Sequence, residues 1–251
     1  MKICTILGVD VAVTNMEETA KYLENNISEL RGKYITVCNS HTLVMSYEDE
    51  EYRNVQNCAV ISLPDGDPLS IVSRRRGFKE AERVTGPDLM EEMFKRGQSG
   101  DGVRHYFYGG TQETLDELKK VLDVKYPKLQ IAGMYSPPFR KLTEEEKQQD
   151  IDRINSSRAD IIWIGLGAPK QENWMYEHRG KLTGVSVGVG AGFDYHAGKL
   201  KRAPKWVQKI CMEWFVRFLQ EPRRLWKRYL VTNVKFILYT SKEGRHINNT
   251  R

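Results

Sequence analysis

The sequence predicts an α/β fold, a Rossmann-like and mostly parallel sheet with helices on both faces. Short apolar runs rich in β-branched and aromatic residues alternate with longer, helix-like stretches over residues 1–194. The runs are apolar almost throughout, as is typical of parallel strands buried on both faces. Residues 195–251 leave this pattern, and we interpret them as a helical appendage on the α/β core.

Each predicted strand is a short, mostly apolar run bounded by turn-forming residues. The first contains Gly8, so it is either one strand or a pair of short strands. In the last, the glycines from Gly188 to Gly192 are followed by Phe193-Asp194-Tyr195, which do not indicate a clear helix. The expected strands are 2–13, 34–38, 59–63, 104–110, 129–135, 160–167 and 185–194.

Helices are predicted from residues that cap their first turns. One helix-like stretch starts at Ser40, directly after a strand. In the appendage, residues 205–220 and 222–240 predict two helices that separate at Glu221-Pro222. The expected caps are Thr14 with Glu17, Asp67 before Pro68, Thr85 with Asp88, Thr111, and Thr143 with Glu146.

Composition indicates a reduced, cytosolic protein. Of 251 residues, 40% are apolar and 29% charged, which is ordinary for a globular protein. No stretch approaches the roughly 20 apolar residues of a spanning helix, and residues 1–13 lack a signal-peptide cleavage site. The four cysteines, of which three lie in apolar runs, show no zinc-site spacing.

Charge is distributed unevenly along the chain. Residues 195–251 contain 14 Lys and Arg against 3 Asp and Glu, whereas residues 1–194 contain 25 against 30. Trp, Phe and Tyr alternate with the basic residues of the appendage, a pattern typical of helices at a membrane interface. An anionic membrane surface is therefore the expected partner. Nucleic acid is the weaker alternative, because no DNA-binding motif is present.

The residues that follow the strands indicate where a ligand binds, because open parallel sheets bind ligands beyond the carboxyl ends of their strands. That edge carries amides, glycines and one carboxylate. Glycines before a helix allow backbone N–H groups to approach a phosphate, although neither a P-loop nor a dinucleotide fingerprint is present. The strand ends are Asn39, Pro64-Asp65-Gly66, Gly109-Gly110-Thr111, Gly165 to Gln171, and Gly190-Ala191-Gly192.

Asp65 is the main candidate for chemistry at this edge. It lies between Pro64 and Gly66, where a turn-forming aspartate is also common. Asp67 completes an Asp-Gly-Asp sequence, which suggests a metal site, but a helix cap is the better interpretation of Asp67. His41 and His196 lie near strand ends without metal-ligand spacing, and a structural role is the alternative for both.

Several longer motifs occur along nearly the whole chain. They are residues 63–66 (LPDG), 82–90 (ERVTGPDLM), 107–110 (FYGG), 165–172 (GLGAPKQE), 188–194 (GVGAGFD), 201–204 (KRAP), Glu213-Trp214 and 220–225 (QEPRRL). In this order they resemble the WecG/TagA/CpsF family of bacterial glycosyltransferases. In that family's pattern a threonine usually stands two residues before Asn39, where this chain has Val37. Thr36 would point to the other face of the strand.

The resemblance implies an inverting, metal-independent and cofactor-free enzyme. It would transfer an N-acetylmannosamine-type sugar, a uronic acid or a hexose from UDP to a polyprenyl-diphosphate-linked acceptor, in teichoic acid or surface polysaccharide synthesis. Such an enzyme would work at the inner face of the cell membrane. The resemblance makes Asp65 the general base, and it gives substrate-binding roles to Asn39, Arg83, Gly109, Gly110, Gly167, Gln171, Glu172, Arg217, Arg224 and Arg228.

A second hypothesis is a non-catalytic nucleotide-sugar-binding or scaffold protein of a membrane polysaccharide complex. Val37 favours it, whereas the retained Asp65 favours the enzyme. The sequence leaves open the donor sugar, the acceptor glycan and whether the protein forms a homo-oligomer.

Overall fold

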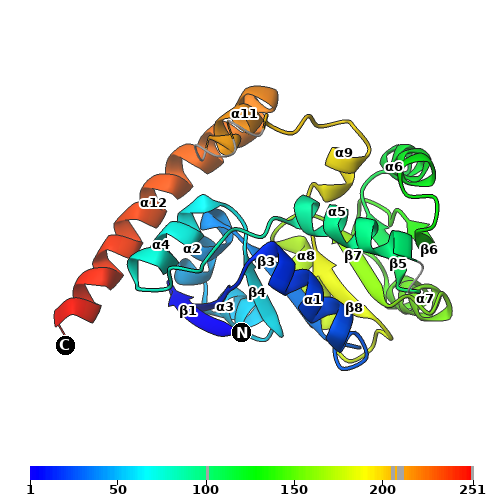
Figure 1. The fold of residues 1–251 in the computed structure, drawn as a ribbon, viewed down its shortest axis with the longest axis horizontal. Helices are drawn as coiled ribbons and strands as arrows, with labels where there is room; N and C mark the ends of the chain where they lie inside the picture. The colour runs from blue at the N-terminus through cyan, green and yellow to red at the C-terminus, as the bar shows by residue number, and fades with distance from the viewer. Residues whose placement is uncertain (100–101, 205–206, 208–211, 250–251) are drawn as a thin grey trace.

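The computed structural model describes residues 1–99, 102–204, 207 and 212–249. In this part of the chain the strands form one sheet in the order β1-β2-β4-β3-β8-β7-β5-β6 (Figure 1). Among the described strands only β1 and β2 pair antiparallel, so the predicted mostly parallel α/β fold is confirmed. The strands are β1 (Lys2–Ile6), β2 (Val9–Val13), β3 (Tyr34–Cys38), β4 (Ile61–Pro64), β5 (Arg104–Gly109), β6 (Gln130–Tyr135), β7 (Ile161–Gly165) and β8 (Val185–Gly188).

Helices cover both faces of the sheet, as β7 illustrates. Its residues Ile161 and Trp163 join a core cluster with side chains of α1, α5 and α6, while Ile162 and Ile164 join another with α7 and α8. This two-sided burial explains the continuous apolar strands. The helices of the core are α1 (Met16–Asn26), α2 (Ser40–Glu48), α3 (Glu50–Asn57), α4 (Asp67–Arg75), α5 (Gly86–Arg96), η1 (Gly97–Ser99), α6 (Gln112–Lys125), α7 (Glu144–Ser156), α8 (Lys170–Glu177) and α9 (Gly192–His196).

Among the described residues after the core lie the helices α11 (Glu213–Gln220) and α12 (Pro222–Asn249). α12 is a long rod that lies along α2 at one side of the molecule (Figure 1). Phe236 of α12 is buried in a cluster with side chains of β1, β2, α2 and α4. Among the described residues, no helix combines the length and apolar composition that a membrane span requires.

The structure corrects two predicted caps. Asn15, and not Thr14, caps α1 by accepting a hydrogen bond from the Glu18 N–H, while the Thr14 hydroxyl is buried beside Thr19. Asp67 is the first residue of α4 and does not cap it, because Gly66 occupies the cap position with φ of 96°. Glycine adopts that backbone angle readily. The helix therefore begins at Asp67, one residue earlier than predicted.

Other boundaries also differ from the prediction. β8 ends at Gly188, because Gly190 turns the chain with φ of 55° and Gly192 then begins the short helix α9. α12 continues past residue 240 to Asn249. Of the helix predicted over 205–220, residues 205–206 and 208–211 lie outside the described chain. Cys58 is exposed at the end of α3, and not buried.

Candidate functional site

A cleft of about 1260 Å³ lies over the carboxyl ends of the parallel strands. Its floor is built by the ends of β3, β4, β7 and β8, and the N-terminal residues of α2, α4 and α5 form part of its walls. α11 and α12 close one side with Trp214, Arg217, Phe236 and Ile237. The predicted position of the site, beyond the strand ends, therefore coincides with the cleft.

Asp65 stands at the end of β4 and lines the cleft. Its N–H donates a hydrogen bond to the carbonyl of Cys38 at 2.6 Å, which joins the ends of β3 and β4. The carboxylate is half-buried, and burial raises its pKa to about 6. Glu213 and Asp88 raise this pKa further, while Arg83 and Arg202 lower it. A base with such a pKa is ionised at neutral pH and still accepts a proton readily.

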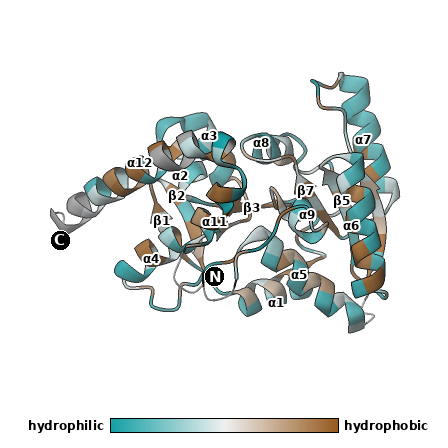
Figure 2. Ribbon diagram, turned by 90° about the horizontal axis from the view of Figure 1, so that it is seen from above, coloured by the Kyte–Doolittle hydropathy of each residue, from teal (hydrophilic) through white to brown (hydrophobic). Residues whose placement is uncertain are grey.

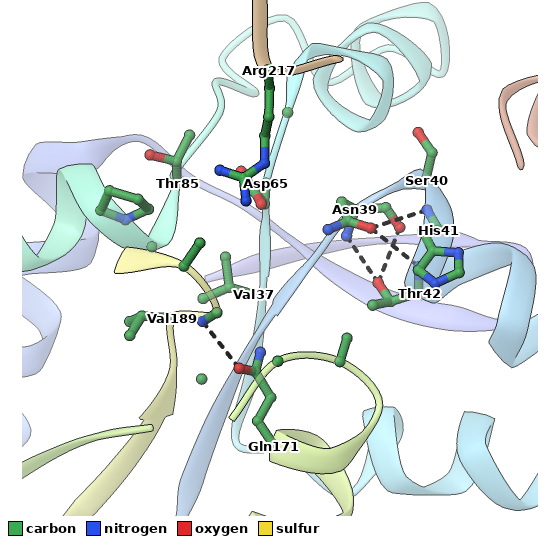
Figure 3. Close-up of a pocket in the computed structure, with 18 of the residues that line it drawn as sticks. Val37, Asn39, Ser40, His41, Thr42, Asp65, Thr85, Gln171, Val189 and Arg217 are labelled. Carbon is green, nitrogen blue, oxygen red and sulfur yellow. Dashed lines mark hydrogen bonds between the residues drawn. The ribbon is translucent and has the colours of Figure 1, made fainter. Parts of the chain in front are cut away.

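Asn39 also lines the cleft, but its side chain caps a helix. Its Oδ1 accepts hydrogen bonds from the N–H groups of His41 and Thr42 and caps α2 (Figure 3). Val37, two residues earlier, faces the cleft, whereas Thr36 points to the other face and donates to Ser62 at 2.9 Å. The alternation of a β-strand accounts for this separation.

Gln171 and Glu172 are buried at the start of α8. The Gln171 Nε2 donates to Glu172 at 2.8 Å, and its Oε1 accepts from the Gly190 N–H at 3.0 Å (Figure 3). The pair therefore fixes the turn that follows β8. Gly167 lines the cleft with φ of 76°, in open space where a side chain would meet no neighbour.

The two glycines at the end of β5 differ in position. Gly110 lines the cleft, while Gly109 packs so closely on Gly165 that a Cβ would lie 2.6 Å from its carbonyl oxygen. The Gly110 N–H donates to the same carbonyl at 3.1 Å. This N–H group, which the sequence suggested for phosphate binding, therefore already donates a hydrogen bond within the protein.

Two of the predicted arginines reach the cleft. Arg83 approaches from the segment before α5, and Arg217 reaches in from α11 with its guanidinium pointing toward Asp65 (Figure 3). Arg217 donates to the Tyr195 hydroxyl at 2.5 Å and pairs with Glu221 at 3.3 Å. The side chains of Arg224 and Arg228 lie outside the described part of the structure.

The histidines have structural contacts. His41 contacts Thr232 of α12 at 3.3 Å, and the His196 ring nitrogen lies 2.9 Å from the Pro87 carbonyl. In the described chain, no three His, Cys, Asp or Glu side chains form a group that could hold a metal ion. Asp67 lies 3.7 Å from Arg83.

Several lining residues were not identified from the sequence. Arg202 and Glu213 meet beside Asp65, although more than 130 residues separate each of them from it in the chain. Residues 137–141, which follow β6, line another part of the cleft. Arg202 and Glu213 belong to the family-typical segments 201–204 and Glu213-Trp214, but these motifs did not give either residue a role in the site, and residues 137–141 lie in no motif.

Apolar side chains line the part of the cleft beside α12, here called the apolar arm. They are Ile71 and Val72 of α4 and Phe236 and Ile237 of α12, with Arg75 among them. The lining of the site thus combines polar groups at the strand ends with apolar side chains of α4 and α12.

Comparison with known proteins assigns the family. The family model described as "Glycosyl transferase WecG/TagA/CpsF family" matches residues 4–249. The chain belongs to this glycosyltransferase family. The resemblance found in the sequence motifs is thereby confirmed, and the protein is a sugar transferase by family.

Two curated relatives carry the same description, N-acetylglucosaminyldiphosphoundecaprenol N-acetyl-beta-D-mannosaminyltransferase. The one from Bacillus subtilis (strain 168) is 28% identical over 244 residues, which cover 96% of this chain and 92% of the relative. The one from Bacillus spizizenii (strain ATCC 23059 / NRRL B-14472 / W23) is 30% identical over 219 residues, covering 87% and 80%.

Proposed function

We propose that this glycosyltransferase moves a sugar from a UDP donor to a polyprenyl-diphosphate-linked acceptor, with inversion at the anomeric carbon and Asp65 as general base. The donor sugar is of the N-acetylmannosamine type, a uronic acid or a hexose. The product enters wall teichoic acid or another surface polysaccharide. The names of the two Bacillus relatives support the lipid-linked acceptor and, among the donors, N-acetylmannosamine.

The observation that carries this proposal is the Asp65 carboxylate in the cleft. Its pKa near 6 leaves it ionised at neutral pH but makes it a stronger base than an ordinary aspartate. The acceptor hydroxyl gives its proton to Asp65 while its oxygen bonds to the anomeric carbon. The bond from that carbon to the diphosphate breaks, and UDP leaves with the electron pair.

The leaving diphosphate needs positive charge as it departs. Arg83 and Arg217 line the same cleft and supply guanidinium groups, which match phosphate oxygens in a bidentate manner. We therefore propose that the reaction proceeds without a metal ion. Since the Gly110 amide is bonded to Gly165, the arginines take the part that backbone amides were expected to share.

The apolar arm supports a lipid-linked acceptor. Ile71, Val72, Phe236 and Ile237 would contact the first isoprene units while the diphosphate stays near the arginines. α11 and α12 also expose further apolar side chains, among them Trp214, Leu219 and Trp226. The ribbon of both helices alternates between hydrophobic and hydrophilic residues (Figure 2). We propose that this face lies on the anionic inner surface of the membrane.

Substitution of Asp65 by asparagine tests the proposal. With a UDP-sugar panel and a polyprenyl-diphosphate N-acetylglucosamine acceptor, UDP release by the Asp65→Asn variant should fall about 10²–10⁴-fold. The matched control is Asp67→Asn, the same change two residues away, which should lose far less. Wild-type protein should keep its activity in EDTA. Near-wild-type turnover of Asp65→Asn would remove Asp65 from the chemistry.

A further inference from the structure

A cluster of charged side chains surrounds Asp65, and its centre is Glu213, the first residue of α11. Glu213 Oε2 lies 3.0 Å from Arg83 Nη1, and its Oε1 lies 3.1 Å from Arg202 Nε. One carboxylate thus bridges two guanidinium groups, one on each oxygen. Arg202 also contacts Asp88 of α5 at 2.9 Å, and Arg83 lies 3.7 Å from Asp67 of α4.

The bridge is shielded from solvent. The side chains of Glu213 and Arg83 are each 20% exposed, and that of Arg202 is 25% exposed. Ion pairs in such a setting are screened less than surface pairs, and removal of one member leaves its partners desolvated without compensation. Glu213 is therefore the side chain on which the arrangement of both arginines depends.

The bridge also sets the position of α11. Arg217 follows Glu213 by one helical turn and points into the cleft (Figure 3). Between the core and α11, Tyr195 lies beneath both guanidinium groups, 5.1 Å from Arg217 and 5.3 Å from Arg202. The position of α11 thus places Arg217 in the cleft and Glu213 against both Arg83 and Arg202.

We propose that Glu213 is a positioning residue of the transferase site: its carboxylate holds Arg83 and Arg202 in one fixed array beside Asp65, and does so only when α11 is docked. The array presents Arg83 to the leaving diphosphate and keeps both cations from pairing with the base. This proposal rests on the proposed function of the same cleft.

The Glu213 charge also affects the pKa of the proposed base, Asp65. Glu213 raises the pKa of Asp65, whereas Arg83 and Arg202 lower it. Loss of the Glu213 charge would remove the first effect and one carboxylate that offsets the charge of both arginines, so the pKa of Asp65 should fall. The charged and titratable groups around the base are Asp67 (α4), Arg83, Asp88 (α5), Arg202, Glu213 and Arg217 (α11), with Cys38 below it on β3.

Kinetics of the isosteric variant Glu213→Gln test the proposal. We expect kcat to fall about 10–100-fold, with a smaller change in the KM for the acceptor, because misplacement of charged groups acts mainly on the transition state. The acidic limb of the kcat/KM profile should move below its wild-type position near pH 6. Glu213→Asp, which keeps the charge on a shorter stem, should recover part of the loss.

The matched control is Glu48→Gln. Glu48 also ties the C-terminal helices to the core, through Lys235 at 2.6 Å and Tyr239 at 2.8 Å, but does so away from the cleft. The Glu48→Gln substitution should leave the pH dependence of kcat/KM unchanged. An equal effect of both substitutions would reduce Glu213 to a docking contact, and a Glu213→Gln variant as active as wild type, or more active, would overturn the proposal.

A second readout does not require turnover. Carbon-13 NMR of labelled aspartate carboxyls follows the titration of Asp65, assigned by comparison with Asp65→Asn. The Asp65 titration should shift to lower pH in Glu213→Gln and stay in place in Glu48→Gln. If wild type releases no UDP, the proposed function fails while this titration still decides whether Glu213 controls the array. An unshifted Asp65 titration contradicts the proposal.

Discussion

The Asp65 carboxylate is ionised at neutral pH, although burial in the cleft disfavours its charged form. The pKa of its carboxyl in the folded protein is about 6, above the 3.8 of an unperturbed aspartate. A raised pKa means that the folded state binds the proton more tightly than the unfolded state. The charged carboxylate therefore destabilises the fold above about pH 6, and this penalty disappears as the pH falls below the unfolded value.

We predict that Asp65→Asn is more stable than wild type at pH 7–8. The gain should be about 1–3 kcal/mol in the free energy of unfolding, because the neutral amide escapes the penalty on the charge. Urea unfolding at several pH values measures it. The difference should vanish near pH 3.5, where both side chains are neutral, and a gain that persists there would assign it to packing.

His105 gives the opposite pH dependence. Burial lowers its pKa to about 4, and its Nδ1 accepts a hydrogen bond from Trp163 at 3.0 Å. Because the unfolded histidine takes up a proton near pH 6.5 and the folded one does not, stability is lost as the pH falls from 6.5 to 4.

We predict that His105→Phe removes this slope. Wild type should lose up to about 3 kcal/mol between pH 6.5 and 4 from this residue, and the variant should not. The variant should also be less stable at pH 7.5, by about 1–3 kcal/mol, since the buried Trp163 N–H loses its acceptor. Urea titrations of the two proteins give both values, and parallel pH curves would contradict the assignment.

At the level of elements, local signals predicted the fold well. The side chains of Thr85, Thr111 and Thr143 cap their helices as expected, because a cap and its partner lie within one turn of chain. The short helix α9 was missed, because five residues carry no periodicity. Asp65 was found because it follows a strand. Glu213 and Arg202 lie in family motifs, but their position beside Asp65 arises from tertiary packing, which local patterns in a single sequence do not reveal.

The attachment of α12 to the core depends on Glu243. Its carboxylate accepts from the Leu7 N–H at 3.1 Å and pairs with Arg76 at 2.6 Å. We predict that Glu243→Gln loosens the outer half of α12 by about 1–3 kcal/mol, since a charge-assisted contact is lost. Hydrogen exchange should become faster over residues 236–243 and stay unchanged in β7. Lys242→Gln, an exposed neighbour, is the control.

At the level of the whole molecule, basic residues and exposed apolar side chains lie on the same helices, α11 and α12. Trp214, Leu219, Trp226, Val234 and Ile237 are exposed on α11 and α12, which belong to the basic part of the chain. On α12, Trp226 and Ile237 are 55% and 63% exposed, whereas Phe236 of the same helix is buried, so the first two remain accessible while the helix packs on the core. This arrangement suits a surface that meets lipid rather than water.

We predict that a Trp226→Ser, Ile237→Ser double variant binds anionic vesicles at least about tenfold more weakly than wild type, because two large apolar side chains no longer enter the bilayer interface. Co-sedimentation with phosphatidylglycerol vesicles measures the loss, and high salt should weaken the binding of both proteins. Val124→Ser, which removes an exposed apolar residue of α6, should bind like wild type. Unchanged binding of the double variant would disprove the docking face.

The contact between Leu7 and Glu243 also bears on the order in which the protein folds during synthesis. The turn residue of the β1–β2 hairpin and the acceptor for its N–H are 236 residues apart in the chain. The rest of the sheet can assemble as synthesis proceeds, whereas this corner is completed only after Glu243 has left the exit tunnel. A polypeptide truncated before residue 243 would therefore leave this corner open and expose the hairpin turn to proteolysis.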